Sequence, residues 1–553
     1  MVSEFEAGSR KPEAGSRKPE AGSRKPEAGL WDTVRAARRV LVILRNPAAA
    51  NRLSDLVRPL TADPRLEVWF TVDHGSGFAG GLPARLTAMG ALQLSWAEAV
   101  EEQFDLALAA SDKTDLHLVQ APVMLMPHGA GFHRFAADTA GEISGLRRSA
   151  LIHDGEVVPA TIVVAHEADI ATLNDIDRRL PERALVAGDP AYQRIVRNLP
   201  LRHRYRQALT ADGRELVLLC STWGPESLFG RNPQLPHDIV TTLPVDRFAV
   251  ALTMHPNVWE RHGELQVRAW TRSATAAGLR LIPAQGEWRS VIVAADLVIS
   301  DHGSLTAYAA AIGKPTLFAA NGGGEVVPGS MMDRLRGGLP QLRTGESLEP
   351  QITAALVGGA RDSELAASAF AAQDALATML TRAYEILNLP LPQHTARNDG
   401  LPIPEVAVQK PTVLHATITE ARESGDQATL RLHRTVAPSS DCHLVANDHT
   451  DDISALERAS AVFSGDLHPS LEHARTRARH LLHTFPGARL TMAETADGAK
   501  VAVLRDHREA TIVGSLPISV ACSGVYWWSR TPDRPQRITI GSGTILASMT
   551  IQS

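Results

Sequence analysis

Residues 297–306, Leu-Val-Ile-Ser-Asp-His-Gly-Ser-Leu-Thr, carry the pattern on which the fold prediction rests. The segment Leu297 to Ser300 is apolar up to its last residue, which is typical of a short buried strand. The turn Asp301-His302-Gly303 follows, and residues 307–312 are expected to be helical. A buried strand that leads through a tight turn into a helix is the repeating unit of a parallel sheet covered by helices.

Strand-like apolar runs of this kind recur in two series along the chain. The first series lies at 40–44, 68–72, 92–94, 106–109, 123–126 and 161–165, and the second at 216–220, 248–253, 279–282, 297–300 and 316–319. Helical segments separate the runs. The sequence therefore predicts an α/β protein with two doubly wound, Rossmann-like domains, at residues 36–198 and 199–389.

Three further regions flank these domains. The heptapeptide Glu-Ala-Gly-Ser-Arg-Lys-Pro occurs three times between Glu6 and Pro26. It has no large apolar residue to bury, so residues 1–35 are expected to be a disordered repeat tail. Residues 390–411 are Pro-rich and indicate a linker. Residues 412–553 combine alternating strands with a helix and predict a small α+β domain.

Composition narrows the class of protein. The chain has 553 residues, of which 44% are hydrophobic, and a formal net charge of −5, so no overall field attracts it to nucleic acid. Its three scattered cysteines fit a reducing compartment, and no apolar run approaches the roughly 18 residues of a membrane span. We expect a cytoplasmic protein.

Polar residues follow three strands of the second series at their carboxyl ends, where open parallel sheets bind ligands. Hydroxyls and free N–H groups at such turns favour an anion, and an aromatic ring can cover a base or sugar. Asp301 is expected to cap a helix or to accept a hydrogen bond from His302. The residues predicted to bind a donor are Thr222, Trp223, Pro256, Asn257, Asp301, His302, Gly303, Ser304 and Thr306.

Two histidines are candidate catalytic residues because each stands just past a strand. His255 could donate a hydrogen bond to a departing phosphate. His128 precedes Gly129, and its imidazole could act as a general base, although a structural histidine is the simpler interpretation of this turn alone. No His or Cys spacing indicates a metal, and Gly313-Lys314-Pro315 does not complete a Walker motif, so we expect a reaction without metal or cofactor.

The order of these segments resembles the CDP-glycerol glycerophosphotransferases of bacterial teichoic-acid synthesis, which have a GT-B fold. The matching motifs, within residues 39–389, are Pro127-His128-Gly129, Gly188-Asp189-Pro190, Ser221-Thr222-Trp223, His255-Pro256-Asn257 and Ser300-Asp301-His302-Gly303-Ser304. The resemblance implies that His128 takes the proton of an acceptor hydroxyl. This sequence departs from the family at Ala130-Gly131-Phe132, at Gly224, where an Arg is common, and at Gly303, where a Ser is usual.

We therefore predict a GT-B-type transferase that moves a glycerophosphate or glycosyl group from a nucleotide diphosphate donor to a hydroxyl acceptor, as in cell-wall polymer synthesis. A lipid-linked acceptor would bring it to the inner face of the membrane. Two alternatives stay open. The departures fit a GT-B-derived nucleotide-binding or scaffold protein without catalysis, and the turn at residues 301–303 also resembles that of UDP-N-acetylglucosamine 2-epimerases. Nucleic acid is not an expected partner.

Overall fold

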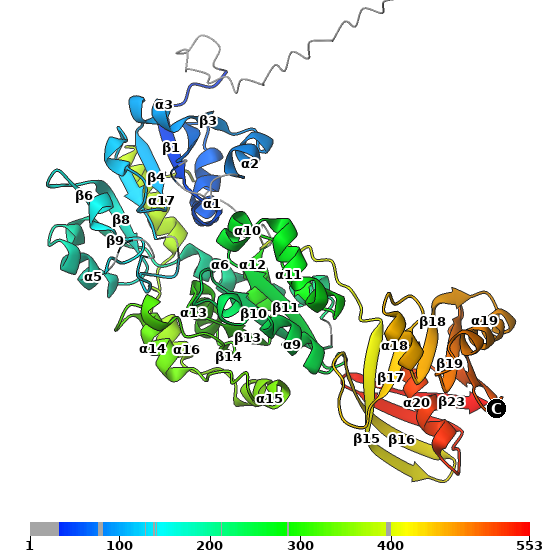
Figure 1. Ribbon diagram of the computed structural model, residues 1–553. Helices are drawn as coiled ribbons and strands as arrows, with labels where there is room; N and C mark the ends of the chain where they lie inside the picture. Colours follow the sequence, from blue (N-terminus) through cyan, green and yellow to red (C-terminus); the bar gives the residue numbers. More distant parts are fainter. Residues whose placement is uncertain are drawn as a thin grey trace, which may run out of the picture.

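The computed structural model describes residues 33–73, 75, 81–127, 129–136, 139, 141–211, 213–284, 287–393 and 400–552. All but the last three residues of the predicted tail, 1–35, lie outside these described residues. Figure 1 shows three bodies in a row, two sheet domains followed by a barrel. No helix in the described part of the chain is long and apolar enough to cross a membrane.

The first sheet has seven parallel strands in the order β3-β2-β1-β4-β5-β8-β9. Alternate residues of β1 enter two different cores, with Val40 and Val42 on one face and Leu41 and Ile43 on the other. Both faces are therefore covered, which explains why the strand is apolar throughout. The strands are β1 (Arg38–Leu44), β2 (Leu66–Val72), β3 (Leu92–Leu94), β4 (Leu106–Ala109), β5 (Val123–Leu125), β8 (Pro159–Val164) and β9 (Ala184–Val186), and the main helices are α1 (Pro47–Thr61), α2 (Leu82–Ala88), α3 (Trp96–Glu101) and α5 (Asp169–Ile176).

The second sheet has five parallel strands in the order β12-β11-β10-β13-β14. Its strand order reverses at β10 and β13, so these two neighbours meet at the topological switch point. The two sheets confirm the prediction of two Rossmann-like domains. The strands are β10 (Glu215–Ser221), β11 (Phe248–Met254), β12 (Arg280–Leu281), β13 (Leu297–Ser300) and β14 (Thr316–Phe318), and the helices include α7 (Arg202–Ala208), α8 (Leu228–Arg231), α9 (Leu235–Thr242), α10 (Pro256–His262), α11 (Glu264–Ala276), α12 (Trp288–Ala294), α13 (Ser304–Ala311), α14 (Met331–Gly338), α15 (Leu348–Gly358) and α16 (Ser363–Ala367).

Before the Pro-rich segment the chain crosses between the sheet domains twice, at places that differ from the expected boundaries. Helix α6 (Pro190–Asn198) already buries Ile195 in the core of the second domain, so the first crossing falls near Gly188, before residue 198. Helix α17 (Ala375–Ile386) returns and buries Met379 in the core of the first domain (Figure 1). The second domain therefore does not extend to residue 389. An amphipathic helix shows in its sequence that one face is buried, but not in which core.

Residues 412–552 form a closed barrel of nine strands in the order β15-β16-β22-β23-β21-β20-β19-β18-β17. Helix α20 (Ile518–Arg530) shares the barrel core through Val520 and Cys522. The expected mixture of strands and helices is present. Closure into a barrel was not predicted, because it pairs β16 with β22, which lie far apart in the chain. The other elements are β15 (Val413–Ser424), β16 (Gln427–Thr435), β17 (His443–Asn447), α18 (Ile453–Arg458), β18 (Ala461–His468), α19 (Leu471–Thr484), β19 (Leu490–Thr495), β20 (Lys500–Leu504), β21 (Glu509–Val513), β22 (Arg537–Ser542) and β23 (Ile545–Gln552).

A buried ion pair fixes the barrel to the second domain. Arg434 of β16 donates from Nε and Nη2 to the two carboxylate oxygens of Asp246, at 2.7 and 2.6 Å. The backbone N–H groups of Val436 and Ala437 also donate to the carbonyl of Thr241. Because Asp246 precedes β11, the barrel docks at the amino ends of the strands and leaves their carboxyl ends uncovered.

The barrel core contains a histidine whose titration should be visible in stability. His443 is buried and its Nε2 lies 2.9 Å from the hydroxyl of Ser523. Burial, helped by the charge of Arg530, lowers the pKa of His443 to about 4, from an ordinary value of 6.5. Between these two values the imidazole is protonated in the unfolded chain and neutral in the folded barrel. The free energy of unfolding therefore decreases as the pH falls from about 6.5 toward 4.

We predict that the parent loses about 3 kcal/mol more unfolding free energy than His443→Gln between pH 7 and pH 4. Denaturant unfolding followed by tryptophan fluorescence at each pH measures the difference. His480→Gln, at an exposed position of α19, is the matched control and should keep the parent's slope. Identical slopes for the parent and His443→Gln would contradict the prediction.

Candidate functional site

A cavity of about 180 Å³ lies between the two sheet domains, at the carboxyl ends of their strands. The first domain lines it with α1 and with the loop that follows β5. The second domain lines it with the loops that follow β10, β11 and β13. This position next to the switch point is where an open parallel sheet is expected to bind a ligand.

Most of the residues predicted from the sequence meet at this cavity. Those that line it are Thr222, Trp223, His255, Pro256, Asp301, His302, Gly303 and Ser304. Thr306 does not, because it is fully buried and its hydroxyl donates to the carbonyl of Asp301. Asn257 is also buried and absent from the lining. His128 lies outside the described residues, although its neighbours Pro127 and Gly129 line the cavity.

Asp301 holds the turn together rather than facing a ligand. Its carboxylate accepts hydrogen bonds from the backbone N–H groups of Thr222, Leu228 and Gly303, at 2.8, 2.8 and 2.9 Å. Burial raises the pKa of this carboxyl, while the neighbouring His302 and the three N–H donors oppose the rise. Its assignment to donor binding is therefore corrected to a positioning role that joins the loops after β10 and β13. Helix α13 carries no side-chain cap, so the expected capping by Asp301 was wrong.

His255 begins helix α10 and presents a defined face of its ring. Its Nδ1 accepts a hydrogen bond from the backbone N–H of Asn257 at 3.1 Å. The neutral imidazole must therefore carry its proton on Nε2. That nitrogen is a hydrogen-bond donor, which suits an anionic oxygen.

Ser304 brings the first domain against the amino end of helix α13. Its Oγ accepts from the backbone N–H of Ala130 at 3.0 Å. A Cβ on Gly129 would lie 2.6 Å from the same Oγ, so only glycine allows this approach. Gly129 and Ala130 are thus held beside the helix end whose partial positive charge attracts anions.

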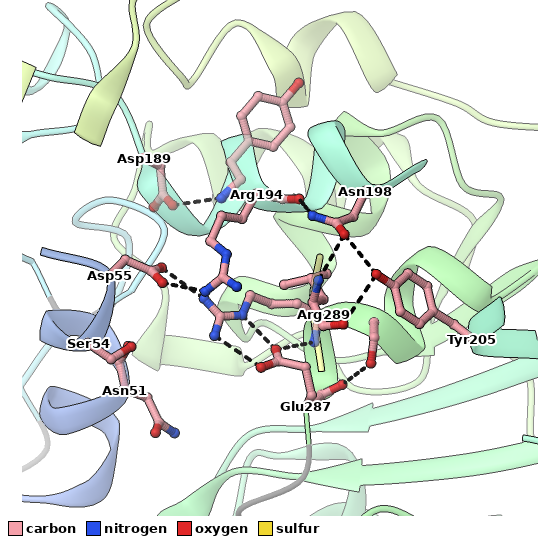
Figure 2. A network of polar contacts seen from close by, with 12 residues as sticks. Asn51, Ser54, Asp55, Asp189, Arg194, Asn198, Tyr205, Glu287 and Arg289 are labelled. Atoms are coloured by element: carbon pink, nitrogen blue, oxygen red, sulfur yellow. Dashed lines mark hydrogen bonds and ion pairs between the residues drawn. The ribbon is translucent and has the colours of Figure 1, made fainter. Parts of the chain in front are cut away.

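The charged contacts across the cleft were not predicted. Figure 2 shows Asp55 of α1 facing both Arg194 of α6 and Arg289 of α12, with Glu287 also paired to Arg289. The Arg289 Nη1 to Asp55 Oδ2 distance is 2.9 Å. Asp55 lies on the buried face of α1, and a buried carboxylate indicates that an oppositely charged partner is present. No local sequence pattern identifies that partner, because the partners are more than a hundred residues away.

A second contact lies where the chain first crosses between the domains. Arg52 Nη1 and the hydroxyl of Tyr308 each lie 2.9 Å from Oδ2 of Asp189. Arg52 also donates from Nε to the carbonyl of Pro127 at 2.9 Å. The buried carboxylate of Asp189, in the segment where the chain first passes between the domains, thus connects helices α1 and α13.

In a third contact, Arg134 of the first domain binds residues of the second domain. Its guanidinium carbon lies 4.7 Å from the ring centroid of Trp223, and its Nη2 lies 2.6 Å from Glu325 Oε2. Glu325 is also 3.0 Å from Nε2 of His302, whose side chain is fully buried. Although burial opposes it, the contacts with His302 and Arg134 lower the pKa of Glu325, so this carboxylate stays ionised.

Metal ligands do not gather in the described residues, where no group of three or more His, Cys, Asp or Glu side chains could hold an ion. The arrangement offers hydrogen-bond donors, a helix end, an aromatic face and paired guanidinium groups. These groups can bind an anion and orient a hydroxyl.

Comparison with known proteins identifies no family for this chain. No protein-family model and no curated protein matches the sequence. A solved structure of the wall teichoic acid polymerase TagF with CDPG matches at 11% identity and a TM-score of 0.42, covering 64% of this chain and 89% of that one. MnaA of S. aureus with UDP matches at 14% identity (TM-score 0.40, 65% of this chain, 100% of that one), and HepE of Anabaena with UDP-glucose at 16% identity (TM-score 0.36, 64% and 100%).

We predict that Asp55→Asn destabilises the protein by roughly 3 kcal/mol, because it leaves the buried Arg289 and the partly buried Arg194 short of a carboxylate. Denaturant unfolding measures the change. Glu264→Gln, which removes the carboxylate of an exposed pair with Arg268, is the control and should change stability by less than about 0.5 kcal/mol. An equal effect of the two substitutions would show that the Asp55 contact is not required.

We also predict that Gly129→Ala and Ser304→Ala are not additive. Gly129→Ala forces a methyl group against Ser304 Oγ and should cost about 1–3 kcal/mol, whereas the same change in a Ser304→Ala background meets a smaller side chain. A double-mutant cycle on unfolding free energies gives the coupling. Additive costs would contradict the contact between the loop and the helix end.

Proposed function

We propose that the protein is a GT-B-type transferase that moves a glycerophosphate or glycosyl group from a nucleotide diphosphate donor to a hydroxyl acceptor. The observation that carries the proposal is the convergence of His255, Trp223 and the amino end of α13 on one cavity at the carboxyl ends of the second sheet. Each of these groups suits a different part of such a donor.

The donor binds mainly to the second domain. Backbone N–H groups at the start of α13 and the hydroxyl of Ser304 receive phosphate oxygens, and Trp223 covers the base or sugar. His255 donates from Nε2 to the phosphate that leaves, and so stabilises the charge that develops there.

The acceptor enters from the first domain. Its hydroxyl oxygen attacks either the phosphorus of the glycerophosphate group or the anomeric carbon of a sugar, and the bond to the departing nucleotide breaks. His128 takes the hydroxyl proton as general base. A lipid-linked acceptor would bring the protein to a membrane surface without a spanning helix.

A binding protein without turnover is the second candidate, and the charges around the cavity favour it. Each arginine that lines the cavity already has a carboxylate partner within the protein: Arg52 has Asp189, Arg289 has Asp55, and Arg134 has Glu325. A highly charged donor would therefore meet little uncompensated positive charge. A cavity of about 180 Å³ is also smaller than the roughly 300–1,000 Å³ of common ligand sites, so a whole donor requires the domains to move apart.

A thermal-shift titration with CDP-glycerol, CMP, CDP, UDP, UDP-N-acetylglucosamine and GDP tests the proposal. A ligand of the folded state at 100 times its Kd should add about 2.7 kcal/mol of stability. The shift should be lost in His255→Ala and Ser304→Ala and kept in His480→Ala, the exposed control. No shift with any ligand would refute a nucleotide site.

Turnover separates the candidates once a donor binds. His128→Ala should keep donor affinity and lose transfer to a hydroxyl acceptor. Donor binding without any product in the parent would support the binding protein. Conversion of UDP-N-acetylglucosamine to an epimer would instead support the epimerase alternative.

A further inference from the structure

Arg134 reaches from the first domain into the wall of the cavity that the second domain builds. The backbone N–H of Phe135 donates to the carbonyl of Glu325 at 2.8 Å, and that of Val327 donates to the carbonyl of His133 at 3.0 Å. These bonds make a short antiparallel bridge across the cleft. They fix the backbone of Arg134 against the second domain.

The guanidinium of Arg134 is held on two sides. Its plane is covered by Trp223, at 4.7 Å from the ring centroid, and its Nη2 is paired with Glu325 at 2.6 Å. Glu325 is itself anchored by the buried imidazole of His302. A cation fixed in this way loses little freedom when it binds a ligand.

Part of the guanidinium has no partner among the described residues. Nε and Nη1 donate to none of the described residues, whereas Nη2 contacts Glu325 and, at 3.4 Å, the carbonyl of Trp223. Arg134 lines the cavity, and 16% of its side chain is exposed. Its remaining N–H groups are therefore available to an acceptor in the cleft.

The residue after Trp223 is Gly224, whose φ of +95° favours glycine. A Cβ built on it would lie 3.5 Å from Nη2 of Arg134, which is an ordinary van der Waals distance. The positive charge beside Trp223 comes from Arg134 of the other domain.

We infer that Arg134 is a ligand-binding residue of the cleft that contacts an anionic group, a phosphate or a carboxylate, through Nε and Nη1. The inference rests on the proposed function for the identity of that group, which in the transferase is a phosphate of the nucleotide diphosphate donor.

Calorimetric titration of the full chain tests the inference, with CDP, UDP, inorganic pyrophosphate and glycerol 3-phosphate as separate probes. Arg134→Gln should weaken binding of the diphosphates by 10- to 100-fold, because charge-assisted hydrogen bonds are lost. Arg134→Lys keeps the charge and should give a smaller loss. Arg272→Gln removes an exposed arginine of α11 and should stay within twofold of the parent.

The probes separate failure of this inference from failure of the proposed function. If pyrophosphate binds in an Arg134-dependent manner and neither nucleotide binds, the anion site stands and the transferase proposal fails. If CDP or UDP binds equally to the parent and Arg134→Gln, the transferase proposal stands and the role of Arg134 is overturned.

Two further outcomes are equally decisive. Arg134-dependent binding of glycerol 3-phosphate alone would keep the anion site and overturn its assignment to the donor. No binding of any probe to the parent would overturn the inference. If Arg134→Gln has a lower melting temperature than the parent, the affinity of Arg134→Lys is compared with that of the parent instead, because a lysine can keep the ion pair with Glu325.

Discussion

The contact of Asp55 with Arg194 and Arg289 is the constraint on which the cleft depends (Figure 2). It joins a helix of the first domain to two helices of the second. Buried charges are costly to desolvate and tolerate little misplacement, so such a contact defines geometry more than it adds net stability. The contacts of Arg52 with Asp189 and of Arg134 with Glu325 act at two other places around the cavity. Together they hold two separately folded sheets in one mutual orientation.

The third body is attached where it cannot obstruct the cleft. The pair of Arg434 and Asp246 docks the barrel at the amino ends of the second sheet, whereas the cavity lies at the carboxyl ends. None of the described residues that line the cavity comes from the barrel. The barrel therefore adds a separate surface to the molecule, and the chemistry proposed for the cleft needs only the two sheet domains.

Much of the site could be predicted because the carboxyl ends of neighbouring parallel strands meet at one edge. Thr222, His255 and Ser304 were found in this way and do line the cavity. Thr306 was wrongly included because helical phase was ignored: two residues beyond Ser304 the side chain has turned by about 200° and points into the core. Arg134 was missed because nothing near it in the sequence indicates that its partners are Trp223 and Glu325.

The sequence by itself determined the strands, the helices between them and the edge at which polar groups gather, since apolar periodicity and turn residues record local burial directly. Only the tertiary structure decided that α17 returns to the first domain, that the last strands close into a barrel, and which charges meet. The physical reason is that a chain with 56 basic and 61 acidic residues allows very many pairings. The long-range topology of the chain decides which of these charge pairs form, and no periodic pattern in the sequence indicates that topology.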